Sequence, residues 1–373
     1  MRQANPADDD RTADNDWRSP VRIVADCTRI RRNAEAVVDL CSRHGVSVVG
    51  VTKCVCGEPE IARAMLAGGC SMLADSRLDN IERLRAAGID ADVLLLRIPA
   101  ISTASAVVRL AQYSLVSEIE TARALSAAAT AQGRTHGVLL MVETGDRREG
   151  VTPERAEGTA RSIRELPGLQ LAGMATALNC LCGMLPTAQT QQAFADLVET
   201  VEAALGYKMR LVSGGHSGDL HLLQAGVTPP RINQFRVGEA ILCGTDFSTF
   251  ADLPMPHTDT FTVFAEVIEV MDKQSAPAGP CGPDAFMRVR EWPDRGLRRR
   301  AIVDLGEIDL STASLQPKRE GVELVGASSD HFVVDVTDAS PPVQLGEELE
   351  FGTLYPAVST GWSSRCCERV VLA

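Results

Sequence analysis

The chain has 373 residues, and at roughly 150 residues per domain this length predicts two domains. Its 45% hydrophobic and 23% charged residues are ordinary for a globular protein, which excludes the disordered and fibrous classes. Aspartate and glutamate number 49 against 37 lysines and arginines, and the net charge of -12 argues against a nucleic-acid partner, because such binding depends on neutralising phosphates.

The first 20 residues are expected to form a disordered tail. They carry an acidic cluster where a secretory signal would have positive charge followed by an apolar core. No apolar run approaches the roughly 20 residues that a membrane-spanning helix needs, so we expect a cytoplasmic protein with no membrane partner. The 11 cysteines are odd in number and spread along the chain, which in a reducing compartment predicts free thiols.

After the tail, short apolar runs alternate with longer segments of helical periodicity, the pattern of βα units around a parallel sheet. The expected strands are 47–53, 71–74, 93–97, 114–117, 138–142, 169–175, 209–213 and 233–237. The clearest helices between them are 59–67, 78–87, 119–131 and 188–205. These units predict an α/β fold in which residues 21–256 form a (β/α)8 barrel of the TIM type. An open doubly wound sheet is the competing interpretation, but its G-x-G-x-x-G fingerprint is absent from the first units.

The alternation of strand and helix patterns ends near residue 256. Short β-rich runs follow, separated by proline, glycine and aspartate, at 260–270, 300–305, 322–324, 332–336 and 347–351. They predict an all-β domain over residues 257–373. Residues 21–25 also have strand character, and because they would make a ninth barrel strand, they are a candidate to pair with the β-domain instead.

The working residues of such a barrel lie at the carboxyl ends of its strands. The first strand ends at Lys53, and a lysine that closes an apolar strand is either a rim residue in solvent or a nucleophile whose pKa is lowered by burial. Glycine-rich loops follow the seventh strand (213–218) and the eighth (236–239), the positions where barrels commonly bind phosphate. Together with Lys53 they indicate an aldehyde-bearing phosphate cofactor, pyridoxal phosphate, with Arg236 directed into the barrel mouth.

At these positions the sequence resembles the alanine racemase-type enzymes, which use pyridoxal phosphate, and most closely their alanine/ornithine racemase branch. The resemblance covers nearly the whole chain after residue 20. It rests on VTKCVCG at 51–57, LADSR at 73–77, TGDRREG at 144–150, SGGHS at 213–217, RVGEAIL at 236–242 and GASSDH at 326–331.

The resemblance implies that Lys53 carries the cofactor as an internal aldimine. It further implies that Ser217, with Gly215 and backbone groups near Gly238, holds the phosphate, and that Arg236 faces the pyridine nitrogen. An arginine there only donates, so it leaves the ring a weaker electron sink, which suits racemisation better than transamination.

Substrate contacts and assembly are implied in the same way. Arg148 matches an arginine near the cofactor phenolate and the substrate carboxylate, and Ser329 and Asp330 match a segment that reaches into the partner subunit's active site. A homodimer with shared active sites follows from this match. No set of side chains has the spacing of a metal site.

Racemisation needs a second acid/base on the face opposite Lys53. Alanine racemases use a tyrosine from the partner subunit, but none lies in the segment 279–286 where it is expected. The candidates are Cys180 with its neighbour Cys182, His331, and Asp284, which could instead orient a substrate ammonium. The cysteines and the histidine also have a purely structural interpretation, as packed or turn cysteines and as a hydrogen-bonded histidine.

We therefore expect an amino-acid racemase that interconverts L- and D-forms by abstracting the α-proton. Departures from the branch at Met141, at 177–180 and at His216 leave the substrate open between ornithine and another amino acid. Decarboxylation or an aldol-type cleavage is the alternative reaction. A non-catalytic carrier of pyridoxal phosphate is the alternative class, although single-domain carriers lack a β-domain.

Overall fold

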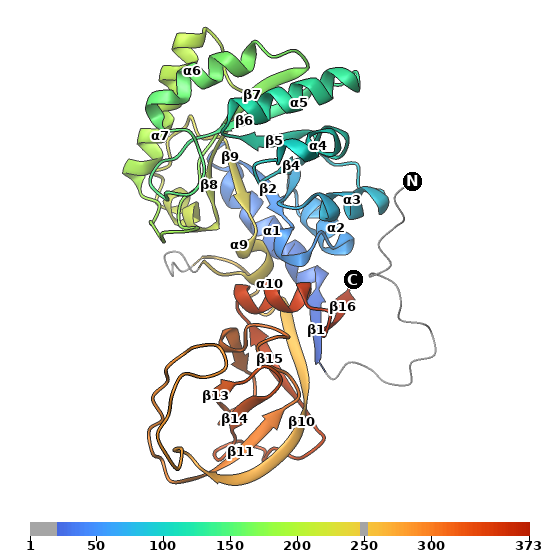
Figure 1. Ribbon diagram of the computed structural model, residues 1–373, viewed down its shortest axis with the longest axis vertical. Coiled ribbons are helices and arrows are strands. Elements are labelled where there is room, and N and C mark those ends of the chain that lie inside the picture. Colours follow the sequence, from blue (N-terminus) through green and yellow to red (C-terminus); the bar gives the residue numbers. More distant parts are fainter. Residues whose placement is uncertain (1–20, 247–252) are drawn as a thin grey trace. The chain divides into compact units, whose positions relative to one another are not determined.

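The computed structural model describes residues 21–246 and 253–373 (Figure 1). The expected tail at 1–20 lies outside these residues. The chain divides into two compact units. The barrel unit spans Asp26–Thr260, and the β unit spans Phe261–Val370 together with the N-terminal residues up to Ala25.

The barrel unit contains a closed barrel of parallel strands, which confirms the predicted fold class. Its strands are β2 (Ser47–Val51), β3 (Met72–Asp75), β4 (Val93–Leu95), β5 (Tyr113–Val116), β6 (His136–Met141), β7 (Leu169–Ala175), β8 (Leu211–His216) and β9 (Gln234–Val237). The barrel closes where β9 pairs with β2, with Val49 opposite Arg236. The carboxyl ends of all eight strands therefore meet at one mouth.

Helices cover the outside of the barrel (Figure 1). They are α1 (Cys27–Ser42), α2 (Pro59–Ala67), α3 (Leu78–Ala86), α4 (Ala104–Leu110), α5 (Ile119–Ala131), α6 (Pro153–Arg164), α7 (Ala188–Leu205), α8 (Leu220–Gln224) and α9 (Glu239–Cys243). The bounds of helix α7 can be predicted from sequence because both ends carry local signals. Thr187 and Thr190 form a reciprocal capping box at its start, and Gly206 ends it in the left-handed conformation.

The barrel interior is a packed apolar core. Its side chains come from successive strands and include Val49, Leu94, Leu115, Leu139 and Met141, each no more than 3% exposed. A filled interior leaves the mouth as the place for chemistry, as in other barrels.

The β unit is an antiparallel sheet of order β12-β15-β10-β11-β14-β13, with β1 and β16 attached through β10. The strands are β1 (Val21–Asp26), β10 (Phe261–Gln274), β11 (Leu297–Val303), β12 (Leu315–Pro317), β13 (Glu323–Ala327), β14 (Phe332–Asp335), β15 (Glu348–Thr353) and β16 (Glu368–Leu372), and α10 (Tyr355–Ser363) follows β15. Strand β1 pairs with β10, Val21 opposite Ala265. Among the described residues, no helix combines the length and apolar character needed to cross a membrane.

Candidate active site

Lys53 lies at the mouth, on the turn that follows β2. Strand β2 ends at Val51, two residues before the predicted end, and Lys53 opens a short 3-10 turn with an exposed side chain. Of the two interpretations of Lys53, its exposed side chain agrees with a rim residue that reaches the solvent of the mouth. The chain has 4 lysines, and the other three have carboxylate partners: Lys208 with Glu202, Lys273 with Glu269, and Lys318 with Glu350. No hydrogen-bond or ion-pair partner faces Lys53 within the part of the chain that the structure describes.

A fully buried carboxylate fixes the turn that carries Lys53. Asp75, at the end of β3, accepts hydrogen bonds from Thr52 Oγ1 at 2.7 Å, Asn80 Nδ2 at 2.9 Å and the Arg77 N–H at 3.0 Å. Burial raises the pKa of Asp75, and these donors oppose the shift. The LADSR motif at 73–77 contains Asp75, but the sequence alone assigned this residue no role. An aspartate at the end of a buried strand is the feature that could have indicated one.

The two glycine-rich loops meet at Ser217. Its Oγ accepts the N–H of Ala240 at 3.1 Å, which joins the turn after β8 to the start of α9. Ser217 is 5% exposed, and no acceptor for its hydroxyl proton is present among the described residues, so this O–H is available to a ligand. A Cβ on Gly238 would lie 3.2 Å from the Val51 Cβ, so the glycine lets β9 end close to β2. At Gly215 a Cβ would come within 2.4 Å of the Phe235 ring, so this position is also restricted to glycine by its neighbour.

Arg236 points from β9 toward the ends of β7 and β8. It is 6% exposed, and its guanidinium donates to the carbonyl oxygens of Ser213, at 2.9 Å, and Thr176. It also donates to the Ser213 hydroxyl. Burial lowers the pKa of Arg236 to about 10, although the nearby charges of Asp219 and Cys180 act to raise it. The guanidinium therefore stays protonated at neutral pH. A guanidinium has five N–H donors, and those not bound to protein can reach a ligand in the mouth.

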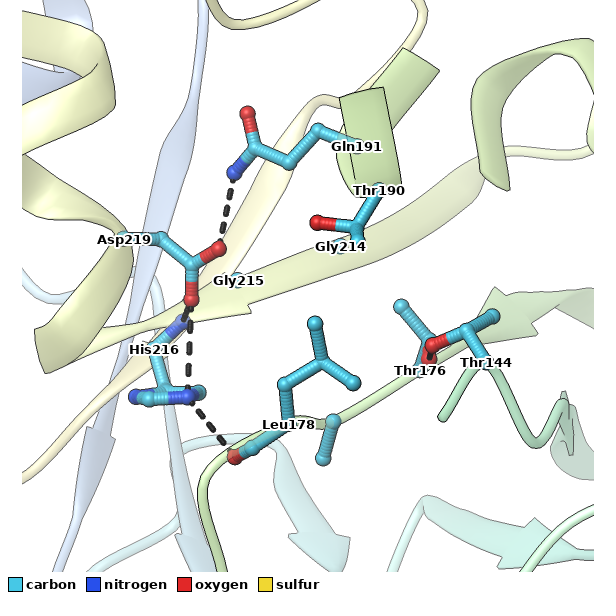
Figure 2. A pocket seen from close by; sticks show the side chains of 10 residues that line it. Thr144, Thr176, Leu178, Thr190, Gln191, Gly214, Gly215, His216 and Asp219 are labelled. Atoms are coloured by element: carbon cyan, nitrogen blue, oxygen red, sulfur yellow. Dashed lines mark hydrogen bonds and ion pairs between the residues drawn. The ribbon is translucent and has the colours of Figure 1, made fainter. Parts of the chain in front are cut away.

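His216 connects the Ser217 turn to the loop after β7 (Figure 2). Its Nδ1 accepts the Gly218 N–H at 3.0 Å, so Nε2 carries the proton and donates to the Leu178 carbonyl, also at 3.0 Å. Asp219 accepts from the His216 N–H and from Gln191 Nε2. A small pocket opens beside this cluster, lined by Thr144, Thr176, Ala177, Leu178, Thr190, Gln191, Gly214, Gly215, His216 and Asp219.

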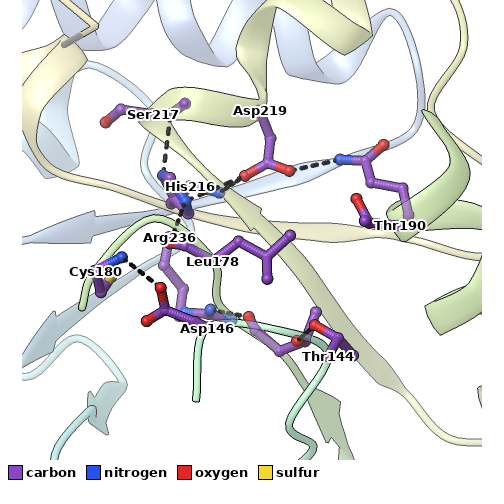
Figure 3. Close-up of polar contacts among 12 residues, drawn as sticks. Thr144, Asp146, Leu178, Cys180, Thr190, His216, Ser217, Asp219 and Arg236 are labelled. Atoms are coloured by element: carbon purple, nitrogen blue, oxygen red, sulfur yellow. Dashed lines mark hydrogen bonds and ion pairs between the residues drawn. The ribbon is translucent and has the colours of Figure 1, made fainter. Parts of the chain in front are cut away.

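Arg148 belongs to the loop after β6 and Cys180 to the loop after β7, and Cys180 lies beside Asp146 in Figure 3. The Nε and Nη2 groups of Arg148 hold the Glu149 carboxylate, with Nη2 at 2.7 Å from Oε1. The same guanidinium is also a hydrogen-bond partner of the Cys180 thiol. Burial lowers the pKa of Arg148, but hydrogen bonds and charges of Glu149 and Cys180 outweigh it and the net shift is upward.

The remaining predicted residues belong to the β unit. The Asp284 carboxylate accepts the N–H groups of Phe286 and Arg288 and pairs with the Arg288 guanidinium at 2.9 Å. These contacts, led by the Arg288 N–H, lower the pKa of Asp284 and keep it ionised. Ser329, Asp330 and His331 lie in the hairpin loop between β13 and β14, where the Ser328 N–H donates to the His331 carbonyl.

The site has no metal centre in the described ranges 21–246 and 253–373, where no group of three or more histidine, cysteine, aspartate or glutamate side chains could hold an ion.

Comparison with known proteins identifies the family. Residues 25–246 match the model of the alanine racemase N-terminal domain. The chain is 36% identical to a lysine racemase of Thermotoga maritima, over 94% of this chain and 98% of the relative, and 31% identical to an ornithine racemase of Acetoanaerobium sticklandii, over 94% and 99%.

Solved structures show the same fold at lower identity. An alanine racemase from Streptomyces lavendulae superposes with a TM-score of 0.73 at 20% identity, covering 96% of this chain and 98% of that one. A D-threonine aldolase from Filomicrobium marinum superposes with a TM-score of 0.71 at 20% identity, covering 91% and 88%. The chain therefore belongs to the alanine racemase family of pyridoxal-phosphate-dependent enzymes, and its full-length relatives are amino-acid racemases.

Proposed function

We propose that the chain is a racemase for amino acids with a basic side chain, lysine or ornithine, and that it binds pyridoxal phosphate through Lys53. The observation that carries the proposal is the free amine of Lys53 at the mouth, in a chain that matches a lysine and an ornithine racemase over almost their full lengths.

The donor set at the mouth fits this cofactor. The phosphate is an anion that requires hydroxyl and N–H donors, and the Ser217 hydroxyl has its proton available beside the start of α9. Arg236 and Arg148 add two cationic groups, which suit a ligand that carries a phosphate, a phenolate and the substrate carboxylate. Gly238 keeps the end of β9 close to the turn of Lys53.

When bound, pyridoxal phosphate makes the α-proton of a condensed amino acid acidic enough to be removed. Lys53 takes or returns that proton on one face through its Nζ, since the amine is exposed and unpaired. Arg236 stays protonated and can only donate, so it would hold the ring nitrogen of the cofactor without protonating it, which would favour quick return of the proton to carbon. Arg148 would bind the substrate carboxylate or the phenolate. The Thr52–Asp75 hydrogen bond orients the turn from which Lys53 acts.

We also propose a homodimer in which Ser329 and Asp330 of one subunit complete the site of the other. The sequence resemblance supports this arrangement.

The test is incubation with single L-amino acids, including lysine, ornithine and alanine, followed by chiral chromatography and by NMR of the α-proton in D2O. Formation of the D-enantiomer from L-lysine or L-ornithine supports the proposal. Release of CO2 or of an aldehyde assigns the decarboxylase or aldolase reaction instead. Bound cofactor without α-proton exchange of any amino acid assigns a non-catalytic carrier.

A further inference from the structure

The loop after β7 holds an exposed cysteine in a fixed position. The carboxylate of Asp146, only 2% exposed, accepts the N–H group of Cys180 at 3.1 Å (Figure 3). It also accepts the N–H groups of Leu181 at 3.0 Å and Cys182 at 3.2 Å. A carboxylate bound by three successive N–H groups anchors the backbone of this segment.

A second contact holds the same loop from its far end. Met184 packs over Gly145, where a Cβ would come within 2.2 Å of the methionine sulfur, and Gly145 has a φ of +141°. The TGDRREG segment after β6 therefore contacts the loop at both ends. Asp146 accepts a hydrogen bond from Cys180, and Gly145 packs against Met184. Cys180 is consequently a preorganised group rather than a residue of a free loop.

The Cys180 thiol faces the guanidinium groups of the proposed site. It is a hydrogen-bond and charge partner of Arg148, and its charge also acts on buried Arg236. A guanidinium beside the sulfur can stabilise the negative charge that develops as Cys180 gives up its proton. By contrast, burial raises the pKa of Cys41 and of Cys70 to about 12, so these thiols stay protonated.

Cys180 and Lys53 approach the mouth from different sides. Around the closed barrel, β7 is separated from β2 by β8 and β9 in one direction and by β3 to β6 in the other. Two proton carriers on opposite faces of a substrate must approach from different directions, which this placement allows.

We propose that Cys180 is the second acid/base, acting on the face of the α-carbon opposite Lys53. The inference rests on the proposed function. In one direction Lys53 Nζ takes the α-proton as the C–H bond breaks, and the Cys180 S–H delivers its proton to the other face, leaving a thiolate. In the reverse direction the two residues exchange roles, and proton exchange with water resets both without an oxidant or reductant.

The first test compares Cys180→Ser with a matched control, Cys182→Ser, in the same loop. Each enantiomer of the substrate is incubated separately in D2O, and α-proton exchange and inversion are followed by NMR and chiral chromatography. Loss of a positioned acid/base typically costs about 10²- to 10⁴-fold. We expect Cys180→Ser to lose inversion by at least about 100-fold while keeping exchange of the one enantiomer that Lys53 deprotonates. Cys182→Ser keeps both reactions.

The second test needs no turnover and uses the wild-type chain. Iodoacetamide labelling at neutral pH, quantified by peptide mass spectrometry, is expected to modify Cys180 about tenfold faster than Cys182, because only Cys180 faces Arg148. The labelled protein should then fail to invert substrate. Equal labelling rates, or a fully labelled protein that racemises at the original rate, would overturn the proposal.

The outcomes separate this inference from the proposed function. If the wild type racemises a basic amino acid and Cys180→Ser does so equally well, Cys180 is not the second acid/base while the racemase assignment stands. His331 or Asp284 would then be the candidates to substitute next. If the wild type exchanges no α-proton at all, the racemase assignment and the role of Cys180 are both wrong.

Discussion

Replacing Thr52 with valine tests whether the buried carboxylate of Asp75 supports the turn of Lys53. Valine keeps the shape of threonine and removes the hydroxyl that donates to Asp75 Oδ2 at 2.7 Å. Both residues are fully buried, so water cannot replace the lost donor. A hydrogen bond to a charged group contributes about 1.5–3 kcal/mol, so we expect a loss of about 2 kcal/mol in the free energy of unfolding, roughly 30-fold in the equilibrium constant.

The pH dependence of this loss follows from the pKa of Asp75. Burial already raises that pKa, and loss of the Thr52 donor raises it further. A raised pKa in the folded state means that the ionised form is the destabilised one, so the penalty is full above the folded pKa of Asp75 and shrinks as the carboxyl becomes protonated at lower pH.

The assay is urea unfolding followed by circular dichroism at several pH values, with Thr52→Ser as the control that restores the hydroxyl. The same variants are loaded with pyridoxal phosphate and dialysed, and Thr52→Val is expected to lose the cofactor faster because the turn of Lys53 is less fixed. The reasoning is refuted if Thr52→Val unfolds at the wild-type midpoint, or if Thr52→Ser is as destabilised as Thr52→Val.

Two further predictions concern stability and assembly. Burial would raise the pKa of Glu202, but hydrogen bonds from Arg231, Lys208 and the Met209 N–H outweigh it and lower the pKa from 4.5 to about 2. That pKa shift corresponds to about 3 kcal/mol in the free energy of unfolding, which is present above pH 4.5 and is lost as the pH falls toward 2. In urea titrations Glu202→Gln should therefore cost about 3 kcal/mol at neutral pH and almost nothing near pH 2. For assembly, Lys53→Ala and Asp330→Ala are each expected to be inactive. Mixing the two variants under conditions in which dimers exchange subunits should recover about a quarter of wild-type activity, because half of the dimers are then mixed and each mixed dimer has one intact site of two. No recovery from mixing, with dimer exchange verified by mass, would exclude a site shared between subunits.

The barrel could be predicted from sequence because its determinants are local. Helices α2, α5 and α7 have the predicted bounds, and each shows its helical periodicity and its end signals within a short segment. The end of β2 was misplaced by two residues, since an apolar run does not show where parallel hydrogen bonding stops. Strand β16 and helix α10 were missed, because β16 owes its strand conformation to pairing with β1, hundreds of residues away in sequence.

The site could be predicted only in part. Lys53, Ser217 and Arg236 were found because parallel strands bring their carboxyl ends to one edge. The hydrogen bonds of Asp75 and Asp146 were not found, since each joins segments from different strands and leaves no pattern within either.

Gly215 has a steric requirement that the sequence could not show. Its phosphate contact stays a prediction, and the structure adds that the glycine makes room for the ring of Phe235 on the neighbouring strand. A glycine pattern reveals that a side chain is excluded, but the group that excludes it lies elsewhere in the sequence.

The most direct measurement of the central claim is to load the wild-type protein with pyridoxal phosphate, reduce it with borohydride, and map the modified lysine by peptide mass spectrometry. The chain offers four lysines, three of them paired with carboxylates. The account predicts that the cofactor is found on Lys53 and that prior incubation with L-lysine or L-ornithine diminishes this label. Label on Lys208, Lys273 or Lys318, or no label at all, would contradict it.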